Sequence, residues 1–78
     1  MTRDDARKWL VNRGFRKRPL FTYEHARYPS YRYVLHIREL RLQMYTLEGE
    51  WVTIFTIAYA NASLTHDGRL TFSAPRET

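Results

Sequence analysis

The stretch that decides the fold class is residues 51–60, which read WVTIFTIAYA. β-Branched and aromatic residues occupy both odd and even positions of this run, a composition typical of β-strands. Because neither face is polar, the pattern predicts a central strand covered on both sides. We expect the core to include Trp51, Phe55 and Ile57 from this strand and Leu35 from an earlier one.

The residues just before this strand predict a hairpin. Residues 48–50, Glu-Gly-Glu, have the composition of a hairpin connection. Residues 39–48 fit two patterns: an alternation in which Leu40 and Met44 share one face of a strand, and a helical stripe that the next glycine would end. We favour the strand.

Two further strands are predicted upstream. Residues 20–27 have a strand composition, and residues 31–38 alternate, with Tyr31 and Ile37 on one face. The apolar positions change parity between Ile37 and Leu40, which indicates a bulge or a tight turn there.

The C-terminal part predicts one more hairpin. Asp67 and Gly68 lie between two short strand-like runs, and an Asp-Gly pair in that position is a signal for a two-residue turn. We expect residues 1–73 to form a single domain and residues 74–78 to be a frayed tail.

The N-terminus predicts a helix over residues 3–13. Thr2 and Asp5 have the spacing of a capping box, and Gly14 supplies the left-handed residue that ends a helix. The apolar stripe that would face the rest of the protein consists of Ala6, Trp9 and Leu10. The predicted fold is therefore α+β, with one N-terminal helix packed on a four- to five-stranded antiparallel sheet. The edges of such a sheet must be charged, covered or paired, so a homodimer is one possible solution.

Composition limits the classes of function. The chain has 78 residues and no cysteine, which excludes disulfides and cysteine-based zinc sites. Neither a signal peptide nor an apolar run long enough to span a bilayer is present in the sequence, so we expect a cytoplasmic protein without membrane contact. Three scattered glycines form no phosphate-binding loop, and no cofactor is expected.

The positive charge is concentrated at one end of the chain. Residues 1–18 contain seven basic residues and two acids, whereas residues 19–78 are neutral, so the net charge of +5 lies in the helix and the loop expected over residues 16–19. Clustered arginine and lysine side chains are typical of phosphate binding. Cations near a helix C-terminus also complement its dipole, which is the structural alternative. The candidate binding residues of this helix-loop are Arg7, Lys8, Arg13, Arg16, Lys17 and Arg18.

Arginine and tyrosine also alternate in the β-region. Arg32, Arg38 and Arg41 are candidate binding residues there, together with Tyr31. Aromatic rings between arginines hold single-stranded nucleic acid by stacking and charge, and the same residue types dominate protein interfaces. The alternative is that the tyrosines belong to the core and the arginines pair with nearby glutamates.

The histidines indicate no metal site, because no pair among the three has the close spacing of metal ligands. His25 with Glu24 and Tyr23 could form an acid–base pocket for RNA cleavage. The helix ending in LVNRGF and the histidine-bearing strand after it resemble the small HicA-type mRNA-cleaving toxins, in which a Gly-Ser-His-His stretch is expected. Residues 23–26, Tyr-Glu-His-Ala, stand in its place, so the chain is not assigned to that family.

Three functional hypotheses follow. The first is a non-enzymatic binding or inhibitor module that docks on nucleic acid or a nucleoprotein complex, similar in size and style to phage accessory proteins such as anti-CRISPR proteins. The second is an endoribonuclease toxin that uses His25 or His36. The third is an inhibitor of an acidic protein that makes no contact with nucleic acid.

Overall fold

The computed structural model describes residues 1–72, and the predicted tail at residues 74–78 lies outside them. Two sheets and one long helix make up this part of the chain. In chain order the elements are α1 (Arg3–Asn12), β1 (Arg16–Arg18), β2 (Thr22–Glu24), β3 (Tyr31–Leu35), β4 (Glu39–Tyr45), β5 (Trp51–Ala58), the short 3-10 helix η1 (Tyr59–Asn61), β6 (Ala62–Leu64) and β7 (Leu70–Phe72).

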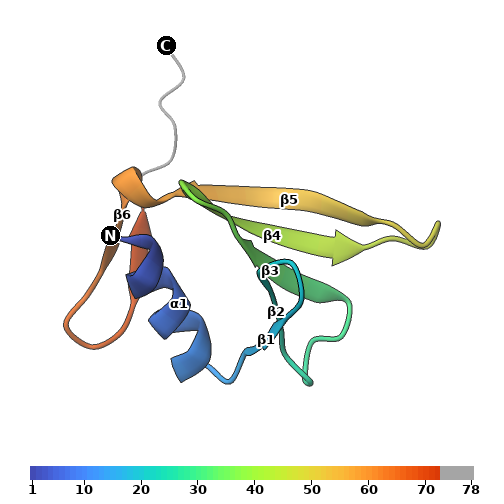
Figure 1. The fold of residues 1–78 in the computed structure, drawn as a ribbon, viewed down its shortest axis with the longest axis horizontal. Coiled ribbons are helices and arrows are strands. Elements are labelled where there is room, and N and C mark those ends of the chain that lie inside the picture. Colours follow the sequence, from blue (N-terminus) through green and yellow to red (C-terminus); the bar gives the residue numbers. More distant parts are fainter. Residues whose placement is uncertain (73–78) are drawn as a thin grey trace, which may run out of the picture.

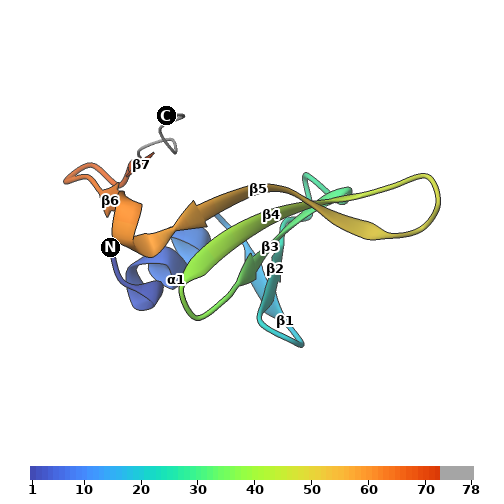
Figure 2. The ribbon, with the colours of Figure 1, turned by 90° about the horizontal axis from the view of Figure 1, so that it is seen from above.

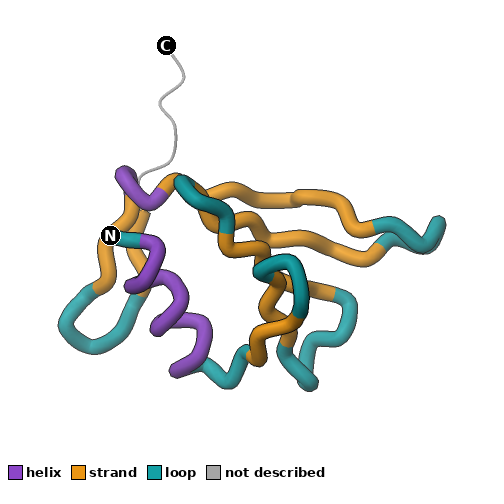
Figure 3. Tube along the Cα trace, in the orientation of Figure 1, coloured by secondary structure: helices purple, strands orange, loops and turns teal. Residues whose placement is uncertain are grey.

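The main sheet is an antiparallel meander of five strands in the order β1-β2-β3-β4-β5. The strands β6 and β7 form a separate two-stranded hairpin beside the helix (Figure 1). Helix α1 lies on one side of the main sheet, and the turn of the β4–β5 hairpin projects away from it (Figure 2). The predicted α+β fold is confirmed: α1 lies at the N-terminal end of the chain, and the only other helical segment of residues 1–72 is the short η1 after β5 (Figure 3).

Helix α1 forms where its local signals predict it. The Thr2 hydroxyl accepts a hydrogen bond from the Asp5 backbone N–H at 3.1 Å, and the Asp5 carboxylate accepts one from the Thr2 N–H at 3.0 Å. At the other end Gly14 has a φ of +88°, and the Phe15 N–H donates to the Leu10 carbonyl at 3.1 Å. These bonds complete a capping box and a Schellman motif.

The core lies between α1 and one face of the sheet. Leu10 is completely buried against the strands, as are Leu40 and, almost completely, Tyr23. The β6–β7 hairpin packs against the same side through Ala62 and Leu70. Leu35 and Ile57 are buried in this cluster, as predicted.

The prediction that residues 51–60 form a central strand is wrong in position. The strand exists, but β5 is an edge strand that pairs with β4 alone among the described residues. Phe55 is therefore 44% exposed, and Trp51 is only half-buried, so neither is a core residue. The pattern predicted a strand correctly, but apolar composition on both faces does not distinguish a centre from an edge.

The predicted basic loop at residues 16–19 is also corrected. Residues 16–18 are strand β1, the other edge of the sheet, and β2 is limited to residues 22–24. Leu20 and Phe21, expected in a strand, form the tip between them, with φ values of +64° and +58°. Turns with positive φ favour glycine and asparagine, so a Leu-Phe pair gives no sequence signal for this tip.

The remaining turns are resolved as tight connections. The predicted break between Ile37 and Leu40 is a hairpin turn, in which the His36 N–H donates to the Glu39 carbonyl at 3.0 Å. Residues 39–45 form a strand, as predicted, and not a helix. Ile37 is consequently 80% exposed rather than on a strand face. The hairpin at Asp67-Gly68 is present, but its loop has three residues between the bonded positions 65 and 69 instead of two.

Candidate nucleic-acid interface

The side of the main sheet opposite α1 is the candidate interface. Successive strand residues alternate between the two faces, so the neighbours of the buried residues Tyr23, Leu40 and Ile57 point away from the helix. The strand register places these neighbours in rows across the five strands. We call this surface the open face, and its residues include Arg16, Arg18, Glu24, Arg32, Arg41, Gln43, Tyr45, Trp51 and Thr53.

Arg32 is fixed at the middle of the open face. Its Nε donates to Gln43 Oε1 at 2.8 Å, and Gln43 Nε2 in turn donates to Thr53 Oγ1 at 3.3 Å. The guanidinium carbon lies 4.3 Å from the centroid of the Trp51 ring, within the range of a cation–π contact. Within residues 1–72 no hydrogen bond or ion pair uses the two terminal nitrogens of Arg32, so they remain available to an anionic ligand.

Aromatic surface adjoins this arginine. The Tyr45 ring meets Trp51 edge-on, with centroids 5.1 Å apart and an interplanar angle of 63°. Tyr45 is 48% exposed. The aromatic rings at the projecting end of the β4–β5 hairpin therefore lie next to the guanidinium of Arg32 on β3. Aromatic rings next to arginine are the combination that binds unpaired bases.

The rest of the open face carries an excess of positive charge. Arg18 Nε lies 3.5 Å from a Glu24 carboxylate oxygen, with the arginine side chain largely exposed and the glutamate side chain about half exposed. Arg41 is paired more closely, at 2.8 Å from Glu39. With Arg16 and Arg32, four arginines face two glutamates on this surface.

The basic residues of the helix do not join this surface. Arg7 and Lys8 both contact Asp4, at 2.7 and 3.3 Å, and their hydrogen bonds lower the pKa of that carboxyl. The guanidinium carbon of Arg13 lies 4.8 Å from the centroid of the Trp9 ring, and its Nη2 donates a hydrogen bond to the Gly68 carbonyl at 3.2 Å. The helix cations are thus engaged with neighbouring groups of the chain.

The other predicted binding residues also lie away from the open face. The side chain of Lys17 points to the opposite face of β1 from those of Arg16 and Arg18, which is the helix side of the sheet. Its Nζ lies 5.6 Å from the centroid of the Phe21 ring. Tyr31 is also on the helix side, opposite Met44, and Arg38 lies in the turn between β3 and β4. Of the ten candidate residues, the structure gathers four on the open face, namely Arg16, Arg18, Arg32 and Arg41.

Sequence reasoning missed the contribution of Trp51 and Gln43. Trp51 was assigned to the core because its strand was expected to be central. Gln43 belongs to no sequence motif. It holds Arg32 only because the register of β3, β4 and β5 places Arg32, Gln43 and Thr53 side by side. Register between distant segments leaves no local signal.

The residues around His25 do not form a shared acid–base pocket. Tyr23 is 2% exposed in the core, whereas Glu24 lies on the open face. The His25 ring packs between Phe15 and Tyr28, with centroids 5.1 and 5.3 Å away, and its Nδ1 accepts a hydrogen bond from the Arg27 N–H. In residues 1–72 no three histidine or acidic side chains are grouped closely enough to hold a metal ion.

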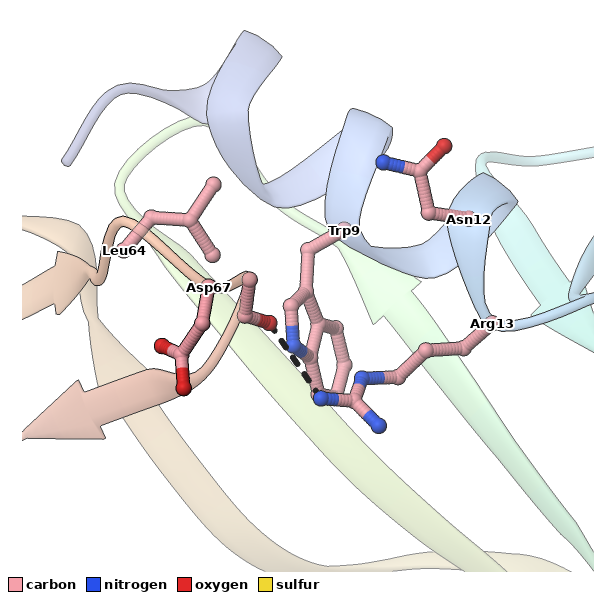
Figure 4. Close-up of a pocket in the computed structure, with 6 residues that line it drawn as sticks. Trp9, Asn12, Arg13, Leu64 and Asp67 are labelled. Carbon is pink, nitrogen blue, oxygen red and sulfur yellow. Dashed lines mark hydrogen bonds between the residues drawn. The ribbon is translucent and has the colours of Figure 1, made fainter.

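One pocket that the sequence did not indicate lies between the end of α1 and the β6–β7 hairpin (Figure 4). It has a volume of about 300 Å³ and is lined by Trp9, Arg13 and Asp67, among others. The Trp9 Nε1 is buried with no hydrogen-bond partner in the described part of the chain. The Thr65 hydroxyl donates to Asp67 and lowers the pKa of that carboxyl.

No protein family model, curated protein or solved structure matches this chain. The one long helix described, α1, has ten residues, and no helix in residues 1–72 has the length and apolarity to cross a bilayer.

Proposed function

We propose that this protein is a non-enzymatic module that binds single-stranded nucleic acid, free or within a nucleoprotein complex, on the open face of its main sheet. The observation that supports this most is Arg32, which Gln43 and Trp51 hold with its terminal nitrogens unengaged among the described residues. Phosphates would contact the arginines, and bases would stack on Tyr45 and Trp51.

A single strand suits this surface better than a duplex. Unpaired bases can lie flat on aromatic rings, whereas base pairs in a duplex are already stacked on each other. The described chain also offers no protruding helix on the open face, because α1 packs on the opposite side. Recognition through a helix in the major groove is therefore not favoured.

The charge distribution gives a quantitative expectation. If each of the four open-face arginines neutralises one phosphate, the logarithm of affinity should fall with the logarithm of salt concentration at a slope of about −3. Fluorescence anisotropy with labelled oligo-uridine and oligo-thymidine at several salt concentrations measures this slope. Affinity that does not change with salt contradicts the proposal.

The double variant Arg16→Glu with Arg18→Glu tests the location of the site. It reverses two charges on the open face and should abolish binding at moderate salt. The matched control is Arg7→Glu with Lys8→Glu, which makes the same change of charge on α1 and should weaken binding much less. Equal losses in the two variants would indicate a general charge effect and no defined interface.

A pull-down from host extract, together with the oligonucleotide assay, separates the alternative functions. A stoichiometric complex with a host protein that survives nuclease, without affinity for either oligonucleotide, would favour an inhibitor of an acidic protein. Cleavage of the labelled RNA that His25→Ala or His36→Ala removes would favour an endoribonuclease.

A further inference from the structure

The two edges of the main sheet are built differently. β1 has three residues, and all of them are basic. β5 has eight residues, and no charged residue occurs between Trp51 and His66. Short, charged edge strands resist pairing with another chain, whereas long, uncharged ones favour it. The chain thus protects one edge of its sheet and leaves the other available.

Three of the exposed side chains of β5 are apolar. Val52, Ile54 and Phe55 are 36%, 47% and 44% exposed. Within residues 1–72 the strand pairs only with β4, and it forms the upper border of the sheet in Figure 1. The outward backbone groups of the strand therefore have no strand partner in the described part of the molecule.

A β-bulge bends this edge but does not close it. The register with β4 shifts between Leu42 and Gln43, where Ile54 is the extra residue. On one side of the bulge residues 55–58 remain regularly paired with β4, and on the other side residues 51–53 do. Both segments keep outward-facing backbone groups that can extend the sheet.

We propose that β5 pairs antiparallel with β5 of a second copy of this chain. The centre of the strand, Thr53-Ile54-Phe55-Thr56, has the same order of polar and apolar residues in both directions. An antiparallel alignment about this centre sets Thr53 opposite Thr56 and Ile54 opposite Phe55 of the second copy. Such pairs are favourable across strands, and the absence of charge removes repulsion between identical edges.

This pairing fixes the relation between the two molecules. An antiparallel pair of identical strands has a two-fold axis perpendicular to the sheet, so both α1 helices lie on one side and both open faces on the other. In the dimer both β5 edges are paired with each other, and the basic β1 strands are the two outer edges of the combined sheet. The assembly therefore stops at two copies.

Sedimentation equilibrium of the nuclease-treated protein, without added nucleic acid, tests the pairing. The wild type should have the mass of a dimer, and Ile54→Lys or Thr56→Lys should have half that mass. Val11→Lys is the matched control, because Val11 is 51% exposed on α1, and it should remain dimeric. A wild type that stays monomeric at high concentration, a lysine variant that remains dimeric, or open-ended assembly contradicts the proposal.

The absence of cysteine permits a direct test of the alignment. Opposite residues in an antiparallel pair have Cα atoms about 4.5–5.5 Å apart, which suits a disulfide. Under mild oxidation an equimolar mixture of Thr53→Cys and Thr56→Cys should give a covalent dimer of one copy of each. Neither variant alone should cross-link efficiently, and equal cross-linking of the single variants contradicts this alignment. Both experiments omit nucleic acid, so their result is independent of the proposed binding function.

Discussion

At the scale of single residues, Arg32 and Trp51 carry the proposed interface. Their mutual position depends on side chains from three strands, since Gln43 on β4 fixes the guanidinium over a ring on β5. Arginine and tyrosine enrichment in residues 31–45 could be recognised from the sequence, but the partner ring could not. A tryptophan in an apolar run predicts a core residue, and only the edge position of β5 makes it available to a ligand.

Trp51→Ala should weaken binding to oligo-uridine by about 1–3 kcal/mol, the range for loss of one stacked base. Phe72→Ala is the control, because this ring is 45% exposed but lies against Phe55, away from the open face. Anisotropy titrations of both variants measure the difference, and circular dichroism verifies that each is folded. Equal affinities for the two variants would remove Trp51 from the site.

Leu20→Gly should stabilise the protein by about 1 kcal/mol, because a left-handed conformation is unfavourable for leucine and not for glycine. Leu20 has a φ of +64° and is 86% exposed, so little buried area is lost. Leu47→Gly is the matched control: Leu47 is fully exposed without a positive φ, and its replacement should give no gain. Urea denaturation measures both. A loss of stability in Leu20→Gly would mean that this leucine makes a contact that its exposure does not reveal.

The protein should lose stability at alkaline pH because Tyr59 is buried with its hydroxyl protonated. Burial raises its pKa to about 12, and its hydroxyl donates to the His36 carbonyl at 2.7 Å. The unfolded chain ionises this group at roughly pH 10, whereas the folded protein holds the proton until about pH 12, so stability should fall across that interval. Tyr59→Phe should flatten this part of the curve in denaturation experiments at several pH values. An unchanged slope would assign the alkaline loss to other groups.

At the scale of elements, local signals predicted more than long-range ones. Helix α1 forms between the predicted caps because Thr2, Asp5 and Gly14 act within a few residues of the helix ends. Strand β4 follows its alternation in the same way. The edge position of β5 was not predictable, because it depends on which segments become neighbours. The Leu20–Phe21 tip was missed because the turn uses residues that normally avoid positive φ.

Thr2→Ala tests the start of the helix. It removes the hydroxyl that accepts from the Asp5 N–H, and it should lower the free energy of unfolding by about 1 kcal/mol. Thr2→Ser keeps a hydroxyl at the same position and should retain most of the stability. Chemical denaturation of the two variants measures the difference, and equal stability would show that the cap contributes little in this fold.

At the scale of the whole molecule, the sequence located the net charge in residues 1–18 but not its division between surfaces. The alternation of β1 separates Arg16 and Arg18 from Lys17, while Asp4 engages the helix cations. The result is an open face with arginines and aromatic rings on one side of the sheet and a helix layer on the other. A dimer through β5 would place two open faces side by side and so enlarge the surface proposed to bind nucleic acid.

The central claim is that the open face binds single-stranded nucleic acid, and a titration followed by amide-resolved NMR tests it most directly. Oligo-uridine added to the uniformly ¹⁵N-labelled protein should shift the Trp51 indole N–H and the Arg32 Nε–H first, together with amides of β1, β3 and β4. The amides of α1 should change little. Shifts confined to α1 and the β6–β7 hairpin, or no shifts at an oligonucleotide excess in low salt, would contradict the account.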